Sequence, residues 1–188
     1  MTEIKQEPGL ETAIFGGGCF WCLEAVFDLV DGVDAVVPGY CGGHVADPEY
    51  RQVCSGGTGH AEVVKIDFDP VRVSYRELLE IFFLIHDPTT VDRQGNDIGP
   101  QYRSVIFVTS DEQLHEALAF IEELGEQRVY PKAIVTRVER APTFWPAEIE
   151  HHDYYVNHSD QPYCQYVVAP KIAKYRGKLA ERRGRHGG

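Results

Sequence analysis

Cys19 is the residue best placed to do chemistry, because three glycines lead directly into it. In the run FGGGCFWCLEAVF, from residue 15 to residue 27, the apolar side chains that follow Cys19 recur at helical spacing. The pattern predicts a short strand over residues 12–15, a glycine loop, and a helix whose first turn carries Cys19. Free N–H groups and a partial positive charge at a helix N-terminus favour a thiolate over a thiol. We therefore expect a reactive cysteine of lowered pKa rather than a buried cysteine in an ordinary strand-to-helix turn.

Two polar loops carry further residues with catalytic potential. Residues 44–59 and 89–101 contain many glycines, prolines and polar side chains, and loops of this length are usually functional or mobile. Glu62 comes just after the first loop and before an apolar run. Burial at such a junction would raise the pKa of its carboxyl group, which makes Glu62 a candidate general acid. On its own, the position is better explained as a solvated glutamate at the end of a strand.

The remaining pattern supplies the elements that must position these loops. Two long helices are predicted over residues 74–86 and 110–127, and each opens with a capping box, Ser74 with Glu77 and Ser110 with Gln113. Strands are predicted over residues 33–40, 62–68, 103–108 and 133–138. The first of these contains a proline, which is typical of an edge or irregular strand. A short helix is predicted within residues 146–156.

The order of these elements predicts one α+β domain over residues 1–188. Two helices long enough to cover one sheet indicate a two-layer α/β sandwich. Regular pattern fades after residue 141, so a long irregular C-terminal segment is predicted to wrap around the domain. We place the catalytic core at about residues 12–160 and a basic tail at about residues 171–188.

Composition and charge restrict the class of protein. The 188 residues are 43% hydrophobic and 25% charged, as is usual for soluble globular proteins. A net charge of −11 argues against general nucleic-acid binding, and the apolar runs are too short to span a bilayer. The N-terminal stretch, residues 1–11, lacks the plan of a signal peptide. We expect a cytoplasmic monomer that binds neither nucleic acid nor membranes.

The charge is distributed unevenly along the chain. Residues 171–188 contain seven of the 18 Lys and Arg residues but only one acid, Glu181. The 170 residues before them carry 11 basic and 28 acidic side chains. We interpret the tail as a solvated, partly frayed terminus rather than an RNA-binding arm.

Five cysteines, at positions 19, 22, 41, 54 and 164, predict catalytic or redox use. The count is odd and the expected compartment is reducing, so a static disulfide framework is not favoured. A zinc site is not favoured either. Cys19 and Cys22 lack a matching second pair, and the adjacent His151 and His152 would point to different faces. We expect no metal and no bound cofactor.

Four separated motifs resemble the peptide methionine sulfoxide reductases of the A type. They are Gly18-Cys19-Phe20-Trp21 and the stretches at residues 50–62, 86–102 and 148–155, in that order. The similarity covers roughly residues 14–176, which is nearly the whole chain. The resemblance implies a ferredoxin-like core with a mixed sheet. It also implies the reduction of the S epimer of methionine sulfoxide, free or in proteins, which repairs oxidative damage.

The resemblance assigns a role to each residue around the sulfoxide oxygen. Cys19 is the nucleophile that attacks the sulfoxide sulfur, and Glu62 is the acid that protonates the oxygen. Tyr50 and Tyr102 donate hydrogen bonds to that oxygen, and Asp97 helps through water. A neutral carboxyl and phenol donors in a dry site would stabilise the charge that develops there.

The resemblance also assigns an apolar pocket for the substrate methyl group to Phe20 and Trp21. Plain core packing is the alternative explanation, and Phe20 would fit it. Trp21 fits it less well, because a buried indole N–H needs a hydrogen-bond partner.

Attack would leave a sulfenic acid on Cys19, and a second thiol would condense with it to form a disulfide. Thioredoxin, or dithiothreitol in vitro, would then reduce that disulfide. Cys164 is slightly favoured as the resolving cysteine, because in this family it often lies near the C-terminus. Cys22 departs from the family, which commonly has a small residue there, but a Cys-x-x-Cys pair can close a disulfide. Cys41 is a third candidate, and Cys54 is predicted to be a small buried packing residue.

Two other functions are compatible with these residues. A cysteine hydrolase would use Cys19 with His60 or His86 as its base. A non-catalytic binding module would hold methionine-like side chains in the aromatic pocket. Both are excluded if the protein reduces methionine-S-sulfoxide and its Cys19→Ser variant does not.

Overall fold

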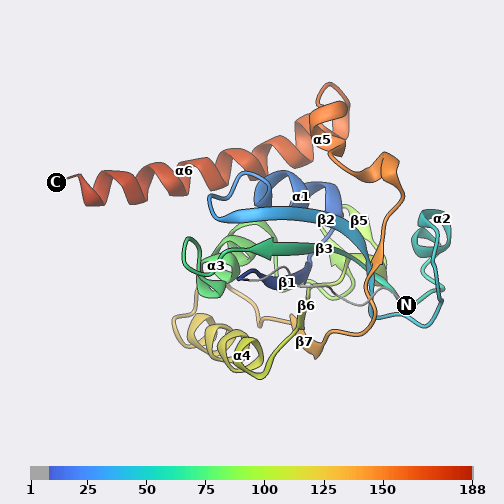
Figure 1. Cartoon of the computed structure of the whole chain (residues 1–188), viewed down its shortest axis with the longest axis horizontal. Coiled ribbons are helices and arrows are strands. Elements are labelled where there is room, and N and C mark those ends of the chain that lie inside the picture. The colour runs from blue at the N-terminus through green and yellow to red at the C-terminus, as the bar shows by residue number, and fades with distance from the viewer. Residues whose placement is uncertain (1–8, 188) are drawn as a thin grey trace.

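The computed structural model describes residues 9–187, and it confirms the α+β class. A six-stranded sheet has the order β7-β6-β1-β3-β2-β8 (Figure 1). Its strands are β1 (Glu11–Gly16), β2 (Val33–Cys41), β3 (Ala61–Phe68), β6 (Val105–Val108), β7 (Arg137–Arg140) and β8 (Trp145–Pro146). Neighbouring strands are antiparallel except for β6 and β7, so the sheet is mixed as expected. The short strands β4 (Arg93–Gln94) and β5 (Asp97–Ile98) pair separately as a hairpin.

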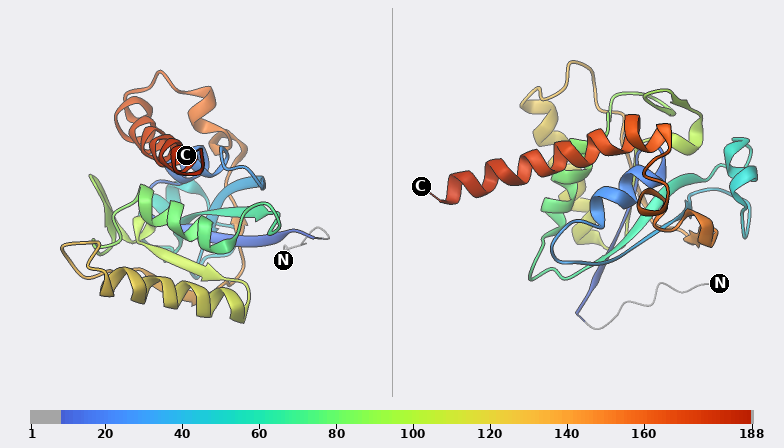
Figure 2. Two further views of the ribbon diagram at one scale, coloured as in Figure 1. Left: turned by 90° about the vertical axis from the view of Figure 1, so that its left-hand side faces the viewer. Right: turned by 90° about the horizontal axis from the view of Figure 1, so that it is seen from above.

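Three helices cover one face of the sheet and a fourth packs on top of them. The three are α1 (Phe20–Phe27), α3 (Tyr75–Ile85) and α4 (Asp111–Glu126), and the fourth is α6 (Ala169–His186). Two short helices, α2 (Tyr50–Cys54) and α5 (Tyr154–Asn157), lie in the chain that connects these elements. Phe15, Val64 and Ile106 point into the core that the sheet shares with α1, α3 and α4. α6 contacts α1 and α3 and extends beyond the domain as one straight rod (Figures 1 and 2).

The opposite face of the sheet has a smaller core. Its buried residues alternate in sequence with those of the first face, as the two-residue period of a strand requires: Ile14, Val63, Val105 and Phe107. Phe144, from the chain between β7 and β8, covers them. The helices therefore lie on one side of the sheet and irregular chain on the other.

The capping box predicted at Ser74 is confirmed. The Ser74 hydroxyl accepts from the Glu77 N–H, and the Glu77 carboxylate accepts from the Ser74 N–H, both at 3.1 Å. At the start of α4 the Ser110 hydroxyl also accepts from the Gln113 N–H. The reciprocal bond predicted there is wrong, because the Gln113 amide oxygen accepts from the Thr109 N–H at 3.0 Å instead of the Ser110 N–H. The Gln113 amide nitrogen donates to the Thr12 carbonyl at 2.8 Å. That bond ties α4 to β1.

Several predicted boundaries differ from the structure. The loop predicted over residues 44–59 contains the helix α2. The strand predicted over residues 133–138 is found four residues later, as β7 at Arg137–Arg140. The helix predicted within residues 146–156 is divided into a 3₁₀ turn at Ile149–His151 and α5, because Asp153 is left-handed at φ 53°. The wrap is irregular up to Tyr163. A π-helical turn at Cys164–Val168 then leads into α6.

The interpretation of the basic tail as frayed is wrong for the described residues. Ile172 and Tyr175 are buried, and Leu179 also packs against the main core. Their spacing of three and four residues gives one apolar stripe, too narrow to stand out in a charged segment. The polar stretch examined for a signal peptide lies largely outside the described residues. No helix in residues 9–187 is both long and apolar enough to cross a membrane.

Candidate active site

Cys19 is the N-cap residue of α1, where the glycine loop from β1 enters the helix. The loop passes very close to neighbouring side chains. A Cβ on Gly17 would lie 2.9 Å from both Phe82 and His86. Gly18 has a φ of +89°, a conformation that favours glycine. Cys19 is only 7% exposed and lines a cavity of about 710 Å³.

The surroundings of Cys19 raise the pKa of its thiol well above the ordinary value. Burial is the largest cause, followed by the nearby Glu62 and Cys22, while the Trp21 N–H and the Tyr163 hydroxyl lower the pKa. The predicted lowering by the helix N-terminus is therefore wrong. Loss of water around the sulfur disfavours the charged thiolate. In the free protein Cys19 is a thiol at neutral pH.

Glu62, the second residue of β3, is fully buried. The solvated glutamate that its position alone favoured is therefore wrong. Its Oε1 accepts a hydrogen bond from the Phe20 N–H at 3.2 Å. Its Oε2 has no partner among the described residues. Burial raises the pKa of Glu62 to about 8, and Asp97 adds to this, while the Phe20 N–H and the Cys19 thiol act against it. Below pH 8 the carboxyl is mainly protonated.

Tyr50 and Tyr102 come from separate loops and face the same pair of groups. Tyr50 begins α2, and Tyr102 ends a 3₁₀ turn at Pro100–Tyr102. Burial raises the pKa of each phenol, Glu62 is the next cause in both, and Cys19 also contributes. The Gly18 N–H donates to the Tyr102 carbonyl at 3.2 Å, which fixes that loop against the glycine loop. The structure thus brings the thiol, the carboxyl and both phenols together.

Asp97, in the β4–β5 hairpin, is held by a residue that the sequence analysis missed. Tyr163 donates from its hydroxyl to Asp97 Oδ2 at 2.8 Å, and the same hydroxyl lies 3.9 Å from the Cys22 sulfur. Tyr163 therefore connects the hairpin, α1 and the C-terminal segment. Its position directly before the candidate Cys164 was the one signal in the sequence.

Phe20 and Trp21 form an aromatic wall. Phe20 is fully buried and lies 6.2 Å, centroid to centroid, from the stacked ring of Tyr50. The Trp21 ring stacks on Tyr154 with centroids 3.7 Å apart and planes within 4°. The Trp21 Nε1–H donates to His151 Nδ1 at 3.2 Å, which supplies the partner that a half-buried indole requires.

Glu148 holds this wall from behind. Its carboxylate accepts from the Tyr40 hydroxyl at 3.0 Å and from the Tyr50 N–H at 3.2 Å. The Nε2 atom of His151 lies 3.7 Å from the same carboxylate. Residues 148–155 form one of the four motifs, but the sequence predicts no role for Glu148 or His151, because neither the turn nor its partners can be read from spacing.

The five cysteines, all free thiols, occupy different environments. Burial raises the pKa of Cys22 to about 11, and both Cys164 and Asp97 add to the rise. Cys164 is fully buried in the π-helical turn. Cys41 is not brought to the site, since it packs on the opposite face of the sheet against the Pro142 carbonyl. Cys54 is exposed at the end of α2, so its predicted burial is wrong.

The two histidines proposed as bases for a hydrolase are already engaged. His60 Nδ1 accepts from the Gly43 N–H at 3.0 Å, and its Nε2 lies 2.7 Å from the Val45 carbonyl. His86 is bonded to the Phe82 carbonyl and, at 2.8 Å, to the Ser104 hydroxyl. Burial lowers the pKa of His86 to about 4. Neither ring has a nitrogen free to take a proton from Cys19.

Comparison with known proteins points to one family. The family model for peptide methionine sulfoxide reductase matches residues 11–183. A peptide methionine sulfoxide reductase MsrA of Ralstonia nicotianae is 55% identical and covers 96% of this chain and 97% of its own. One of Nautilia profundicola is 57% identical and covers 87% of this chain and 92% of its own.

Solved structures give the same result. Reduced Mxr1 from Saccharomyces cerevisiae has a TM-score of 0.80 and 34% identity, and covers 85% of this chain and 92% of its own. Methionine sulfoxide reductase A of Corynebacterium diphtheriae has a TM-score of 0.71 and 32% identity, and the match covers 81% of this chain and 77% of its own. The chain belongs to the peptide methionine sulfoxide reductase family. It is an oxidoreductase, and its activity is the thiol-dependent reduction of methionine sulfoxide.

Proposed function

We propose that Cys19 attacks the sulfur of methionine-S-sulfoxide, free or in proteins, while Glu62 protonates the oxygen. One observation supports this most directly. The Glu62 Oε2 atom is buried beside Cys19 without a hydrogen-bond partner among the described residues. A buried polar atom left unpaired is costly, and a sulfoxide oxygen is the acceptor that a protonated carboxyl would satisfy.

The raised pKa values of Cys19 and Glu62 suit an exchange of protons between them. Glu62 gives its proton to the sulfoxide oxygen as the Cys19 sulfur bonds to the substrate sulfur. The thiol proton passes to the carboxylate in turn. The oxygen then moves to Cys19, so that thiol and sulfoxide become sulfenic acid and thioether. The cysteine sulfur is oxidised by two electrons and the substrate sulfur is reduced by two.

The neighbours of the oxygen would set both rate and stereochemistry. Tyr50 and Tyr102 donate hydrogen bonds to it, because both phenols face Glu62 and Cys19. Asp97, which raises the pKa of Glu62, acts through water. The wall of Phe20 and Trp21 holds the methyl group. With methyl, oxygen and attacking sulfur fixed, only one epimer presents its sulfur to Cys19.

Cys22 is better placed than Cys164 to resolve the sulfenic acid first, which reverses the slight preference drawn from the sequence. Cys22 lies close enough to raise the pKa of Cys19, and its N–H donates to the Cys19 carbonyl at 3.1 Å. Condensation of the sulfenic acid with the Cys22 thiol releases water and forms a disulfide. Cys164, which neighbours Cys22, can then attack that disulfide and return Cys19 to a thiol.

An external dithiol would complete the cycle. Mxr1 from Saccharomyces cerevisiae has been solved in complex with Trx2, at a TM-score of 0.58 and 28% identity to this chain. We propose thioredoxin as the reductant here as well, with dithiothreitol as its substitute in vitro, in a reducing compartment such as the cytoplasm. The protein would act as a monomer and hold no cofactor of its own.

A stereochemical assay tests this proposal. The protein is incubated with dithiothreitol and either the S or the R epimer of methionine sulfoxide, and methionine is measured. Turnover of the S epimer alone is expected. Equal turnover of both epimers would contradict the assigned pocket.

Peptide mapping after one turnover without reductant locates the disulfide. A Cys19–Cys22 link in the Cys164→Ser variant, together with a Cys22–Cys164 link in the wild type, is expected. A Cys19–Cys164 link in the Cys22→Ser variant formed at the wild-type rate would return the resolving role to Cys164.

A further inference from the structure

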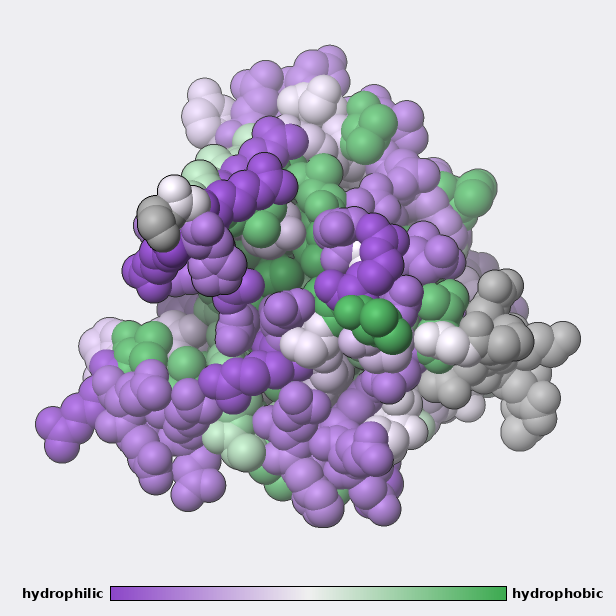
Figure 3. All heavy atoms as spheres, turned by 60° about the vertical axis from the view of Figure 1, so that its left-hand side comes forward, coloured by the Kyte–Doolittle hydropathy of each residue, from purple (hydrophilic) through white to green (hydrophobic). Residues whose placement is uncertain are grey.

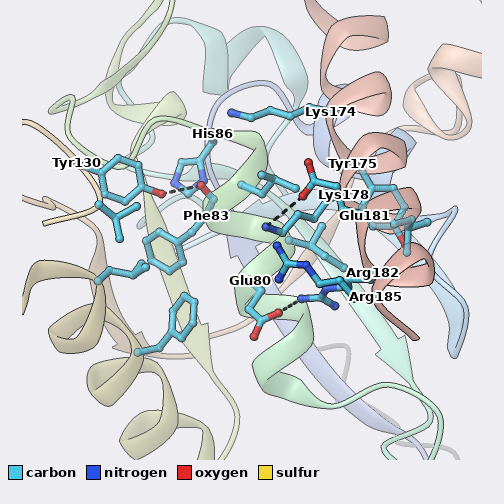
Figure 4. Close-up of a pocket in the computed structure, with 16 residues that line it drawn as sticks. Glu80, Phe83, His86, Tyr130, Lys174, Tyr175, Lys178, Glu181, Arg182 and Arg185 are labelled. Atoms are coloured by element: carbon cyan, nitrogen blue, oxygen red, sulfur yellow. Dashed lines mark hydrogen bonds and ion pairs between the residues drawn. The ribbon is translucent and has the colours of Figure 1, made fainter. Parts of the chain in front are cut away.

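The cavity at Cys19 adjoins a second cavity along α6. The second has a volume of about 620 Å³ and is shown in Figure 4. The two cavities share four lining residues: Leu84, His86, Tyr130 and Lys174. Together they form one groove, here called the α6 groove, that begins at the reactive thiol and runs between α6 and the pair α3 and α4. No residue that lines the second cavity has a role in the proposed reaction.

Five basic residues of α6 line the groove. They recur every three or four residues and so share one face of the helix: Lys171, Lys174, Lys178, Arg182 and Arg185. In Figure 4 the ends of Lys178 and Arg182 point across the cavity toward α3. The basic charge of this otherwise acidic chain is thus concentrated beside the route to the thiol.

Two acidic residues, Asp87 and Asp97, line the first cavity, and the two that line the second are already paired. Glu80 contacts Arg182, and Glu181 lies 3.9 Å from Lys178. Within the described residues, Lys174 and Arg185 have no carboxylate within ion-pair distance. Positive charge therefore remains available at both ends of the second cavity.

The base of the groove is apolar. Phe83, Phe120 and Leu124 line it from α3 and α4. Figure 3 shows hydrophobic surface in a hollow bordered by hydrophilic residues on this side of the molecule. A ligand that fits must carry negative charge on one side and apolar groups on the other.

We propose that the α6 groove binds the polypeptide on one side of the oxidised methionine, and that flanking acidic and apolar residues are preferred. The proposal rests on the proposed function, since the groove begins at Cys19. The 12 residues from Lys174 to Arg185 span about 16.5 Å, because each helical step rises about 1.5 Å. About five residues of extended chain, at about 3.3 Å each, cover that length.

A pair of peptides tests the preference. Each peptide has one methionine-S-sulfoxide and a flank of six residues. In one peptide of the pair leucine alternates with glutamate, and in the other it alternates with lysine. The pair is made twice, once with the flank before the sulfoxide and once with the flank after it. Pre-reduced protein is used without reductant, so that only the substrate step is measured. In one of the two orientations, the glutamate peptide is expected to react about tenfold faster at sub-saturating concentration. Salt at 0.5 M should remove most of the difference, because exposed charges are then screened.

Variants of α6 assign the preference to the groove. Lys174→Glu combined with Arg185→Glu should abolish or invert the ratio of the two peptide rates, and the milder pair Lys174→Gln and Arg185→Gln should reduce it. Arg176→Glu combined with Arg183→Glu, on the same helix but not among the residues that line the groove, makes the same charge change and should leave the ratio intact.

Three results would overturn the proposal: equal rates for both peptides in both orientations, an unchanged ratio in the double variants, or a variant defect confined to recycling by thioredoxin. The last would assign the groove to the reductant. Free methionine-S-sulfoxide is too short to reach the second cavity, so its reduction by the wild type tests the proposed function separately.

Discussion

Glu62, in β3, and Glu24, in α1, are buried glutamates, and each accepts a hydrogen bond from a backbone N–H. Burial raises the pKa of Glu62 to about 8 and that of Glu24 to about 7. Their neighbours differ. Glu62 faces the Cys19 thiol and two phenols, whereas Glu24 faces Asp153 and accepts from the Tyr154 N–H at 3.3 Å. A raised pKa alone therefore does not identify a catalytic acid, and the role proposed for Glu62 rests on its free oxygen beside Cys19.

The role of Glu24 is to hold the C-terminal segment. Its bond to the Tyr154 N–H fixes the start of α5, and the Tyr154 ring covers Trp21. Glu24 thus acts on the site only through the position of an aromatic ring. Substitutions should therefore separate a carboxyl group that faces the thiol, Glu62, from one that holds a backbone segment, Glu24.

The largest effect on turnover is expected at Cys19, whose thiol Glu62 faces and Glu24 does not. Cys19→Ser should lower turnover of methionine-S-sulfoxide by more than about 10⁴-fold, because a hydroxyl is a far weaker nucleophile and forms no sulfenic acid. Methionine formation with dithiothreitol measures the loss, and an unchanged melting temperature shows that the variant is folded. Appreciable residual turnover would mean that another cysteine is the nucleophile.

Substitution of the two glutamates tests the comparison directly. Glu62→Gln should slow reduction in a single turnover by about 10²- to 10³-fold, since loss of general acid catalysis has this magnitude. Glu24→Gln, the matched control, keeps a hydrogen-bond acceptor for Tyr154 and should change the rate by less than about threefold. Comparable losses in the two variants would remove the distinction between them.

The pH dependence of the single-turnover rate sharpens the assignment. Glu62 must be protonated to act as an acid, so the rate should fall as pH rises above about 8, the raised pKa of this group. The fall should approach tenfold per pH unit, disappear in Glu62→Gln and persist in Glu24→Gln. A wild-type rate that stays constant from pH 7 to pH 10 would rule out protonated Glu62 as the acid.

The smallest effect concerns stability. Both carboxyl groups have a higher pKa in the folded state, so folding binds protons at intermediate pH. The stabilisation is complete below about pH 4.5 and is lost as pH rises through about 7 for Glu24 and about 8 for Glu62. The melting temperature should therefore drop between pH 6 and pH 9, and less so in either glutamine variant. An equal drop in all three proteins would place the cause elsewhere.

Most of the fold follows from local pattern. Apolar periodicity located β1, β3, α3 and α4, because each buries one regular face and begins at a recognisable cap or turn. α6 was missed because its buried stripe is narrow and most of its residues are charged. β7 was misplaced because its parallel pairing with β6 depends on a distant strand rather than on its own residues.

The site was predictable only as a set of residues. The motifs named Cys19, Glu62, Tyr50, Tyr102 and Asp97, and the structure brings these five together. The pKa of Cys19 could not be obtained in this way, because burial is a property of the folded molecule. Glu148, His151 and Tyr163 act through contacts with distant segments, so sequence spacing carries no signal for them.

The stacking of Trp21 on Tyr154 gives the protein an optical reporter of its own chemistry. The chain has two tryptophans, and the other one, Trp145, lies in β8. Trp21 is also one of the two residues between Cys19 and Cys22, so any disulfide that links these sulfurs must alter the surroundings of its indole. Emission from Trp21 should change with each oxidising turnover and return on reduction, and a Trp145→Phe variant would isolate that signal for stopped-flow kinetics.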